Sequence, residues 1–360
     1  MSTRVYTLPV EQTQWHVAGG AETVFNWEYD EGRDRLLNLY EKGKTKQWNS
    51  RDRIDWSTPV DHDNPFEGPE AYVPIYGSDV WEQMGERDRA QLLHHVASWQ
   101  FSQFLHGEQG ALICAAKIVQ TVPDIDSKFY AATQVMDEAR HVETYSRFLH
   151  EKLDLAYPIN PHLKSLLDNV VTDSRWDMTY LGMQVLIEGL ALAAFGLIRD
   201  VAENPLARAV TAYVMEDEAR HVAFGRLALR DFYPQLSQSE RDEREEFCVE
   251  ACYLMRDRFL AEEMWGHMGF DVDEAVKYVQ QSESQRTFRS LLFTRIVPML
   301  RDIGLWGPRI HNAFADMGVM GYEAIDLDQV MADDENQADE IDKARIRQVD
   351  ETIAVGAAVA

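Results

Sequence analysis

One six-residue stretch that occurs twice limits the folds open to this chain more than any other feature of the sequence. Asp-Glu-Ala-Arg-His-Val runs from residue 137 to 142 and again from residue 217 to 222. The same offset, without gaps, maps Glu108 onto Glu188, and both glutamates lie in apolar, alanine-rich stretches. A fixed offset of this kind is typical of an internal structural repeat. We therefore expect two copies of one unit, each with a glutamate in its first half and the six-residue stretch in its second.

Helical periodicity dominates the chain from Asp88 onward. Apolar residues recur there at the spacing of an α-helix, and breakers are scarce within each periodic stretch. Prolines fall between the stretches, where proline can begin a helix but cannot continue one; they are Pro123, Pro158, Pro161, Pro205 and Pro234. The expected helices span about residues 88–121, 126–153, 174–203, 205–231, 238–267 and 272–303. Each repeat unit is therefore a helical hairpin.

The regions on either side of these helices differ from them in composition. Residues 1–87 are aromatic-rich and contain a cluster of turn-forming residues between Pro59 and Pro74, so we expect an irregular arm packed on the helices. Residues 304–360 form a C-terminal extension, and beyond Tyr322 we expect an acidic, flexible tail with a short helix at most. The helical domain is assigned to residues 88–303.

Glu188 lies inside the longest apolar run of the chain, Leu181 to Ile198. Because Gln184 and Glu188 interrupt this run, we expect a buried helix and not a membrane span. A lone carboxylate in such a helix is costly unless it is protonated or bound to a cation. Glu188 therefore predicts a cationic partner in the core.

The glutamates and histidines of each hairpin lie at one depth. The first glutamate precedes the joint by about 15 residues and the glutamate of Glu-x-x-His follows it by about 13, which at about 1.5 Å per residue brings the two level. The i, i+3 spacing puts Glu138 and His141 on one helix face, as it does Glu218 and His221. Two such hairpins around a pseudo-two-fold axis offer four carboxylates and two imidazoles to one centre, as in ferritin-like bundles that hold two metal ions.

The predicted fold is therefore all-α: a ferritin-like four-helix bundle with additional helices and an irregular N-terminal arm. The predicted metal ligands are Glu108, Glu138, His141, Glu188, Glu218 and His221. Oxygen-rich ligation with one imidazole per ion and no thiolate favours iron or manganese over a structural zinc. We expect two iron ions, with a manganese and iron pair as the alternative. A solvated helix face would explain a single Glu-x-x-His equally well, but two copies at one offset disfavour that reading.

Asp137 and Asp217 each precede a predicted ligand glutamate. Metal-bound imidazoles normally donate their second N–H to a carboxylate, so we expect crosswise pairs, Asp217 with His141 and Asp137 with His221. The arginine of each repeated stretch would balance an aspartate, with a surface salt bridge as its alternative.

Charge and cysteine content narrow the partners and the compartment. Acidic residues outnumber basic ones 61 to 35, the formal net charge is −26, and no basic stripe suits nucleic acid. Cys114, Cys248 and Cys252 lack the spacing of a disulfide framework or a zinc knuckle. The N-terminus has no signal-sequence pattern. We therefore expect a cytoplasmic protein that contacts neither nucleic acid nor a membrane.

At these residues the chain resembles the di-iron carboxylate oxygenases and oxidases. They include hydroxylase subunits of bacterial multicomponent monooxygenases, the ribonucleotide reductase small subunit with its ligand-binding oxidase relatives, and arylamine N-oxygenases. The resemblance covers about residues 88–231, and residues 40–48 with 54–56 are similar to the arm that precedes such bundles. It implies O₂ activation, with the six predicted ligands holding iron. It also implies an electron-donor protein, such as a reductase or ferredoxin, and leaves a homodimer open.

Several positions depart from particular relatives. The hydroxylases usually carry a threonine, as part of a proton relay, where this chain has Leu192. The two residues that crosslink in ligand-binding oxidases fall on Ala111 and Met183, so that ether bond is excluded. N-oxygenases have an extra histidine where this chain has Val214, so a third histidine ligand is absent. The radical-bearing reductase subunits have a tyrosine four residues after the first ligand histidine, and Tyr145 occupies that position.

The predicted function is O₂-dependent oxygenation, of the hydroxylase or monooxygenase type, of a small apolar or aromatic substrate. A candidate pocket, with ordinary core packing as the alternative, is formed by Phe104, Ala111, Leu112, Ala115, Ala191, Leu192 and Phe195. Three other functions are left open: iron handling as in ferritins, a radical-generating or oxidase subunit, and a metal-free helical interaction protein. Tyr145 is thus a tentative catalytic residue, although a packed core tyrosine is the commoner role.

Overall fold

The structure is a computed structural model that describes residues 15–26, 29 and 32–359. Within that part of the chain every regular element is a helix, so the predicted all-α fold is confirmed. Residues 1–14, on which the expected lack of a signal sequence rests, lie outside the described residues. The division into arm, helical domain and extension stays a prediction.

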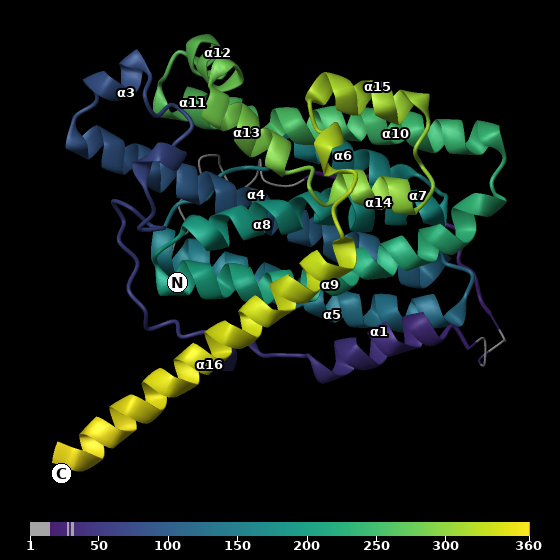
Figure 1. The fold of residues 1–360 in the computed structure, drawn as a ribbon, viewed down its shortest axis with the longest axis horizontal. Helices are drawn as coiled ribbons and strands as arrows, with labels where there is room; N and C mark the ends of the chain where they lie inside the picture. The colour runs from purple at the N-terminus through teal and green to yellow at the C-terminus, as the bar shows by residue number, and fades with distance from the viewer. Residues whose placement is uncertain (1–14, 27–28, 30–31, 360) are drawn as a thin grey trace.

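Two antiparallel helical hairpins form the core. α4 (Glu86–Thr121) pairs with α5 (Ile125–Phe148), and α8 (Glu188–Val201) pairs with α9 (Pro205–Phe232). The four helices run side by side through the centre of the molecule (Figure 1). These hairpins are the two copies of the repeat, and together they make the predicted four-helix bundle.

Side-chain caps fix the start of the second helix in each hairpin. At the start of α5, Asp124 accepts a hydrogen bond of 2.8 Å from the main-chain N–H of Ser127. At the start of α9, Asn204 accepts hydrogen bonds from the N–H groups of Leu206 and Ala207, and Pro205 occupies the first helical position. Such caps satisfy N–H groups that the helix leaves without partners. They fix the residue at which each helix begins and so the depth of its Glu-x-x-His pair.

The helix that carries Glu188 is not uniform. The expected helix 174–203 consists of α7 (Trp176–Tyr180), the π-helix η4 (Leu181–Ile187) and α8. π-Helical turns inside α-helices occur frequently at functional sites. This one ends directly before Glu188 and so sets the direction in which that side chain leaves the helix. The apolar pattern contains no signal for it, because all seven residues of η4 are buried.

Further helices cover the side of the bundle that faces upward in Figure 1. One of them, α6 (Pro161–Thr172), was not predicted, although its buried residues Leu163, Leu166, Leu167 and Val170 have helical spacing. Two predicted helices are divided. Residues 238–267 form α10 (Gln238–Asp257), η6 (Arg258–Leu260) and α11 (Glu262–Met268). Residues 272–303 form α12 (Val272–Gln281), α13 (Glu283–Leu291) and α14 (Ile296–Asp302), followed by α15 (Pro308–Met317).

Local backbone conformation explains the breaks. Ala261 has a φ of 55°, a left-handed conformation that ends the first segment although no glycine or proline marks it. Ser282, with a ψ of 127°, leaves helical geometry between α12 and α13. α5 ends in a π-helical turn, η3 (Leu149–Leu153). Three other short turns complete the fold: η2 (Glu70–Tyr72), η5 (Tyr233–Gln235) and η7 (Met320–Tyr322).

The N-terminal arm is more helical than expected. It contains α1 (Asp34–Thr45), α2 (Ser50–Arg53) and α3 (Asp79–Gln83). As expected, the arm packs on the core: α1 lies against α5 and α9, along the lower edge of the bundle in Figure 1.

The C-terminal extension differs from the expected short helix, because α16 runs from Leu327 to Val359. Its first half packs on α9, and its second half projects beyond the bundle (Figure 1). Asp334 of α16 is buried and contacts the guanidinium groups of Arg199 and Arg295. Buried ion pairs of this kind depend on distant parts of the chain, so the acidic composition alone did not indicate them.

The segment Trp176–Val201 is long and apolar enough to cross a membrane, but 83% of its most apolar window is buried inside the protein. This burial is what we expected of the run around Glu188.

Close packing of α9 on η4 generates a stability prediction. A Cβ atom on Gly225 would lie 2.4 Å from Cβ of Gln184, an atom that cannot move without its backbone. We expect Gly225→Ala to destabilise the fold by about 2 kcal/mol through overpacking. The measurement is thermal and urea-induced unfolding.

The matched control is Gly107→Ala on α4, where an added Cβ meets nothing within 4 Å. That change should be neutral or stabilise by up to about 1 kcal/mol through helix propensity. Equal unfolding midpoints for the two variants would contradict the packing described here.

Candidate metal centre

Six buried side chains from four helices meet at the centre of the bundle. α4 contributes Glu108, α5 contributes Glu138 and His141, α8 begins with Glu188, and α9 contributes Glu218 and His221; none is more than 5% exposed. The structure therefore brings together all six residues that the repeat singled out. They form two groups, and the possible ligand atoms within each group lie within 4.8 Å of one another.

Glu138 belongs to both groups. One group is Glu108, Glu138, His141 and Glu218, and the other is Glu138, Glu188 and His221. Glu218 also lies between the imidazoles, since its Oε1 is 3.1 Å from Nδ1 of His141 and 3.4 Å from Nδ1 of His221. Glu138 and Glu218 would thus help to hold both ions, whereas Glu108 belongs only to the first group and Glu188 only to the second.

The donor atoms of this cluster fit two metal ions. Oε2 of Glu188, both carboxylate oxygens of Glu218 and Nδ1 of His221 have no hydrogen-bond partner among the described residues. Nδ1 of His221 is 3.1 Å from Oε1 of Glu138, yet the two are not in hydrogen-bonding geometry. Buried polar atoms without partners are costly, and four carboxylates balance two divalent cations. Metal ions would satisfy these atoms and their charge together.

Each imidazole turns its other nitrogen toward an aspartate. Nε2 of His141 is 3.1 Å from Oδ2 of Asp217, and Nε2 of His221 is 3.2 Å from Oδ2 of Asp137. The aspartates thus lie crosswise, as the sequence analysis expected. A carboxylate at Nε2 holds the proton there and leaves Nδ1 free for a metal.

The arginines of the repeat are buried and contact these aspartates. Arg140 donates from Nη2 to Oδ1 of Asp137 and to Oδ2 of Asp217, both at 2.6 Å, and Arg220 pairs with Asp217. A surface salt bridge, the alternative for these arginines, is excluded because Arg140 is 7% and Arg220 is 2% exposed.

Two residues of the arm, which the sequence analysis did not single out individually, complete this layer. Trp48 donates from Nε1 to Oδ2 of Asp217 at 2.7 Å, and Gln47 donates to Oδ1 of Asp137 at 2.6 Å. Both lie in the stretch 40–48 that resembles the arm of di-iron proteins, so a signal was present. Gln134, which was also missed, donates to Glu138 and Glu188 at 3.0 and 2.9 Å. Its position one turn before Glu138 was the available signal.

The electrostatics of the cluster favour protons where metal is absent. Burial and the neighbouring Glu218 raise the pKa values of Glu108 and Glu188 well above the usual range. Burial alone would lower the pKa of His141, but Glu108 and Asp217 outweigh it and raise the pKa well above 6.5. For Glu138 burial acts upward, but the two histidines prevail and hold its pKa below the usual range.

Tyr145 lies in the aromatic core beside this cluster. It is fully buried, and its ring contacts Phe101, Phe104 and Phe195 at centroid distances of 5.5, 5.8 and 5.9 Å. Its hydroxyl has no hydrogen-bond partner among the described residues. Burial, together with the charges of Glu108 and Glu218, raises its pKa well above 10, which keeps the hydroxyl protonated.

A small cavity of about 20 Å³ adjoins Glu108, Glu188 and Glu218. Of the predicted pocket residues, Phe104, Ala111, Ala191 and Phe195 line it, whereas Leu112, Ala115 and Leu192 do not. Lining residues that were missed include Gln103, Met183 and Arg258; the first two lie five residues before a ligand glutamate, and Arg258 is far from every ligand in sequence. This volume holds about one water molecule, so a larger ligand requires the cavity to widen.

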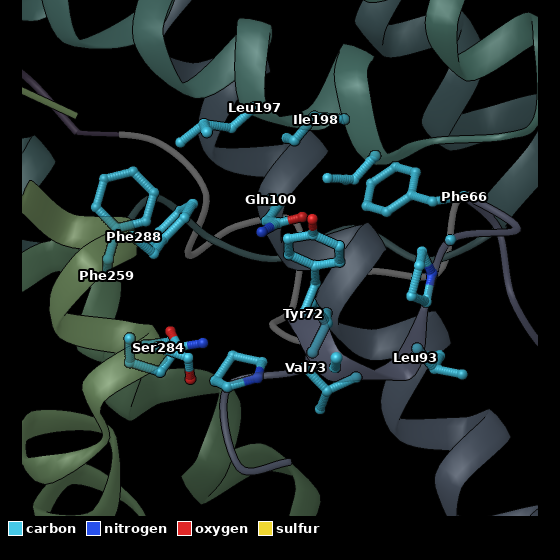
Figure 2. A pocket seen from close by; sticks show the side chains of 18 of the residues that line it. Phe66, Tyr72, Val73, Leu93, Gln100, Leu197, Ile198, Phe259, Ser284 and Phe288 are labelled. Carbon is cyan, nitrogen blue, oxygen red and sulfur yellow. The ribbon is translucent and has the colours of Figure 1, made fainter. Parts of the chain in front are cut away.

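A cavity of about 560 Å³ lies farther along α4 and α8. In Figure 2, Phe259 and Phe288 border one side, Phe66 borders the other, and Tyr72 and Gln100 lie between them. Its volume is typical of small-molecule sites.

Fold and cluster together define a ferritin-like protein of the di-iron carboxylate oxygenase and oxidase superfamily. Residues 30–304, more than half of the chain, match the family described as P-aminobenzoate N-oxygenase AurF. This chain belongs to that family. It is a di-iron oxidoreductase that activates O₂ for oxygenation, so the predicted superfamily and general function are confirmed.

Solved structures with a similar backbone include two variants of an R2-like ligand-binding oxidase, each with a Mn/Fe cofactor. One is 19% identical with a TM-score of 0.47, and the other is 18% identical with a TM-score of 0.45. Each match covers 78% of this chain and 96% of the oxidase chain. No curated protein matches this chain.

The raised pKa values generate a prediction about metal uptake. Because burial and neighbouring charges raise the pKa values of Glu108 and Glu188, and neighbouring carboxylates raise those of both histidines, Fe²⁺ competes with protons for these side chains. Lowering the pH from about 8 to about 6 increases the protonated fraction, so apparent Fe²⁺ affinity should fall. Anaerobic calorimetry in buffers of different ionisation enthalpy measures affinity and proton release. Uptake that releases no protons and does not change with pH would contradict this electrostatic description.

Proposed function

We propose that the buried centre binds two iron ions and uses O₂ to oxygenate the amino nitrogen of a small aromatic amine. The proposed ligands are Glu108, Glu138, His141, Glu188, Glu218 and His221. The observation that carries the proposal is the shared position of Glu138 in two buried acid–histidine groups, within a chain of the P-aminobenzoate N-oxygenase family. The aromatic lining of the neighbouring cavities supports an aromatic substrate.

The residues of this chain would act by binding, orienting and excluding water. Bound iron supplies the redox chemistry of O₂. Asp137 and Asp217 hold the histidine protons at Nε2, so that Nδ1 stays available. Phe104 and Phe195, whose rings meet edge to face at 4.6 Å, line the small cavity and would help to exclude water. The hydroxyl of Tyr145 stays protonated beside Glu108 and Glu218.

The overall reaction requires an external reductant. Inserting one oxygen atom of O₂ into an N–H bond and reducing the other to water consumes two electrons and two protons. We propose that an electron-donor protein, a reductase or ferredoxin, supplies the electrons. A homodimer, a mixed manganese and iron centre as the alternative metal content, and a cytoplasmic location also belong to the proposal. The three cysteines are free and buried, in keeping with a reducing compartment.

Val214 is the residue at which this site differs from the histidine pattern expected of N-oxygenases. It is fully buried and occupies the position at which a third histidine was expected in such enzymes. The proposed ligand set therefore has two imidazoles. Val214 packs in the hydrophobic core and does not line the small cavity.

Removal of a ligand carboxylate tests the proposal. We expect Glu188→Ala to lose at least one iron ion and all O₂-dependent conversion of 4-aminobenzoate, because the change removes a metal bond and unbalances the charge of the cluster. The measurements are iron content after anaerobic loading and product analysis after reduction and exposure to O₂.

The matched control is Glu250→Ala, an exposed glutamate on α10 far from the cluster in sequence. It should keep two iron ions per chain and normal turnover. Full iron content and activity in Glu188→Ala would refute the ligand assignment, and a loaded parent protein that oxygenates no aromatic amine would refute the substrate class.

Tyr145 separates the oxygenase from the radical-generating alternative. Tyr145→Phe keeps the ring packing with Phe101 and removes a hydroxyl without a hydrogen-bond partner. In an oxygenase we expect turnover to stay within about tenfold, or about 1.4 kcal/mol in the activation barrier. Electron paramagnetic resonance after O₂ exposure is the second measurement. A tyrosyl signal in the parent protein, together with an inactive variant, would favour the radical subunit.

A further inference from the structure

Arg258 is a buried cation without a visible counter-ion. It begins η6 and is 5% exposed. Its Nε has no hydrogen-bond partner, and among the described residues no carboxylate oxygen is in ion-pair contact with its guanidinium. The acid that acts on it electrostatically is Glu263, whose oxygens already accept hydrogen bonds from Trp99 and Asn160. Arg258 therefore lacks what a buried guanidinium normally has.

The other described buried arginines all have acceptors. Five contact an aspartate: Arg140, Arg199, Arg220, Arg244 and Arg295. The sixth, Arg289, donates to the main-chain carbonyl of Val279 at 3.0 Å. The exception, Arg258, is the one that lines the cavity next to the metal centre.

Arg258 lines the same small cavity as Glu108, Glu188 and Glu218. Gln103 also lines it, five residues before Glu108 on α4, which corresponds to about 7.5 Å along a helix. The Gln103 side chain accepts a hydrogen bond of 2.7 Å from the N–H of Asn160, and Asn160 reaches the main-chain carbonyl of Arg258 at 3.5 Å. Arg258 and the three glutamates therefore border one cavity, so a molecule that widens it could contact both.

The large cavity is lined by residues adjacent in sequence to those of the small one. Arg258 lines the small cavity, and the next residue, Phe259, lines the large one, with the guanidinium 5.0 Å from the Phe259 ring centroid. On α4, Gln100 lines the large cavity, and Gln103, about one turn later, lines the small one. Figure 2 shows Gln100 and Phe259 at the border of the large cavity. Arg258 is thus next to the aromatic cavity in sequence and contacts one of its lining rings, while it lines the cavity of the glutamates.

The positive charge of Arg258 favours the binding of an anion. Burial lowers the pKa of Arg258 to about 10, which still leaves the side chain charged at neutral pH. Two divalent ions are balanced by the four carboxylates of the cluster, so none of these is left to balance Arg258, and Glu263 is not in ion-pair contact with it. A carboxylate on the ligand would neutralise it through a two-pronged, charge-assisted hydrogen bond.

We propose that Arg258 is the specificity residue of the site: it binds the carboxylate of an aromatic acid and thereby directs the opposite, uncharged end of the ring to the metal-binding glutamates. This inference rests on the proposed function for the reacting group, but the assignment of Arg258 to the anion does not depend on which atom is oxidised. Phe104 and Phe195 would have to turn aside to admit the ring.

Binding without turnover tests the assignment. Iron-loaded protein, kept free of O₂ and reductant, is titrated by calorimetry with 4-aminobenzoate and with the neutral isostere 4-aminobenzamide. We expect the parent protein to bind the acid at least about tenfold more tightly, because the amide leaves Arg258 without an anion. Arg258→Gln should bring the two dissociation constants together, and Arg258→Lys, which keeps the charge and loses the planar fork, should give an intermediate ratio.

The matched control is Arg289→Gln, which removes a buried guanidinium that lines a different cavity. It should keep the preference of the parent protein. Arg258→Gln or Arg258→Lys with an unchanged preference, a parent protein without preference, or acetate competing as well as 4-aminobenzoate would overturn the assignment. An Arg258-dependent preference for the acid without any oxygenation would support the assignment and refute the proposed function alone.

Discussion

The structure depends on one constraint: four carboxylates and two imidazoles must be held together in a core that excludes water. Glu138, Glu218 and both histidines are at most 1% exposed, so their charges cannot be offset by solvent. Protons offset part of this charge, as the raised pKa values of Glu108 and Glu188 show, and two divalent ions offset it more completely. The hairpin repeat serves this constraint, since each hairpin delivers two carboxylates and one imidazole at the same depth.

A second layer of charged and polar residues holds the metal-binding histidines in place. Asp137 and Asp217 are hydrogen-bonded to Nε2 of the two histidines, and Arg140 donates to both aspartates. From the arm, Gln47 donates to Asp137 and Trp48 donates to Asp217. The arm is thus tied to the metal centre through hydrogen bonds as well as packed on the bundle. A buried network of this kind fixes one arrangement, because each member that loses its partner leaves a costly unsatisfied group.

Where the helices depart from regular geometry, they shape the approach to the centre. η4 ends directly before Glu188, and the left-handed Ala261 ends η6, the turn that begins with Arg258. The small cavity adjoins the glutamates, and the larger aromatic cavity is lined by other turns of α4 and α8. Each hairpin supplies the same donors to the metal centre, whereas Arg258 lines the small cavity from outside both hairpins. This difference underlies the direction proposed for a bound molecule.

The sequence by itself determined the helical fold, the two hairpins, the six residues that meet and the crosswise partners of the histidines, because helix spacing and an exact internal repeat are local properties of the chain. Only the tertiary structure decided the π-helix before Glu188, the break after Leu260, the length of α16 and the aromatic cavity. These features depend on contacts between residues far apart in sequence, such as Asp334 with Arg199 and Arg295. The lack of an ion-pair partner for Arg258 among the described residues is another such feature, because it can be recognised only once the positions of all neighbouring side chains are known.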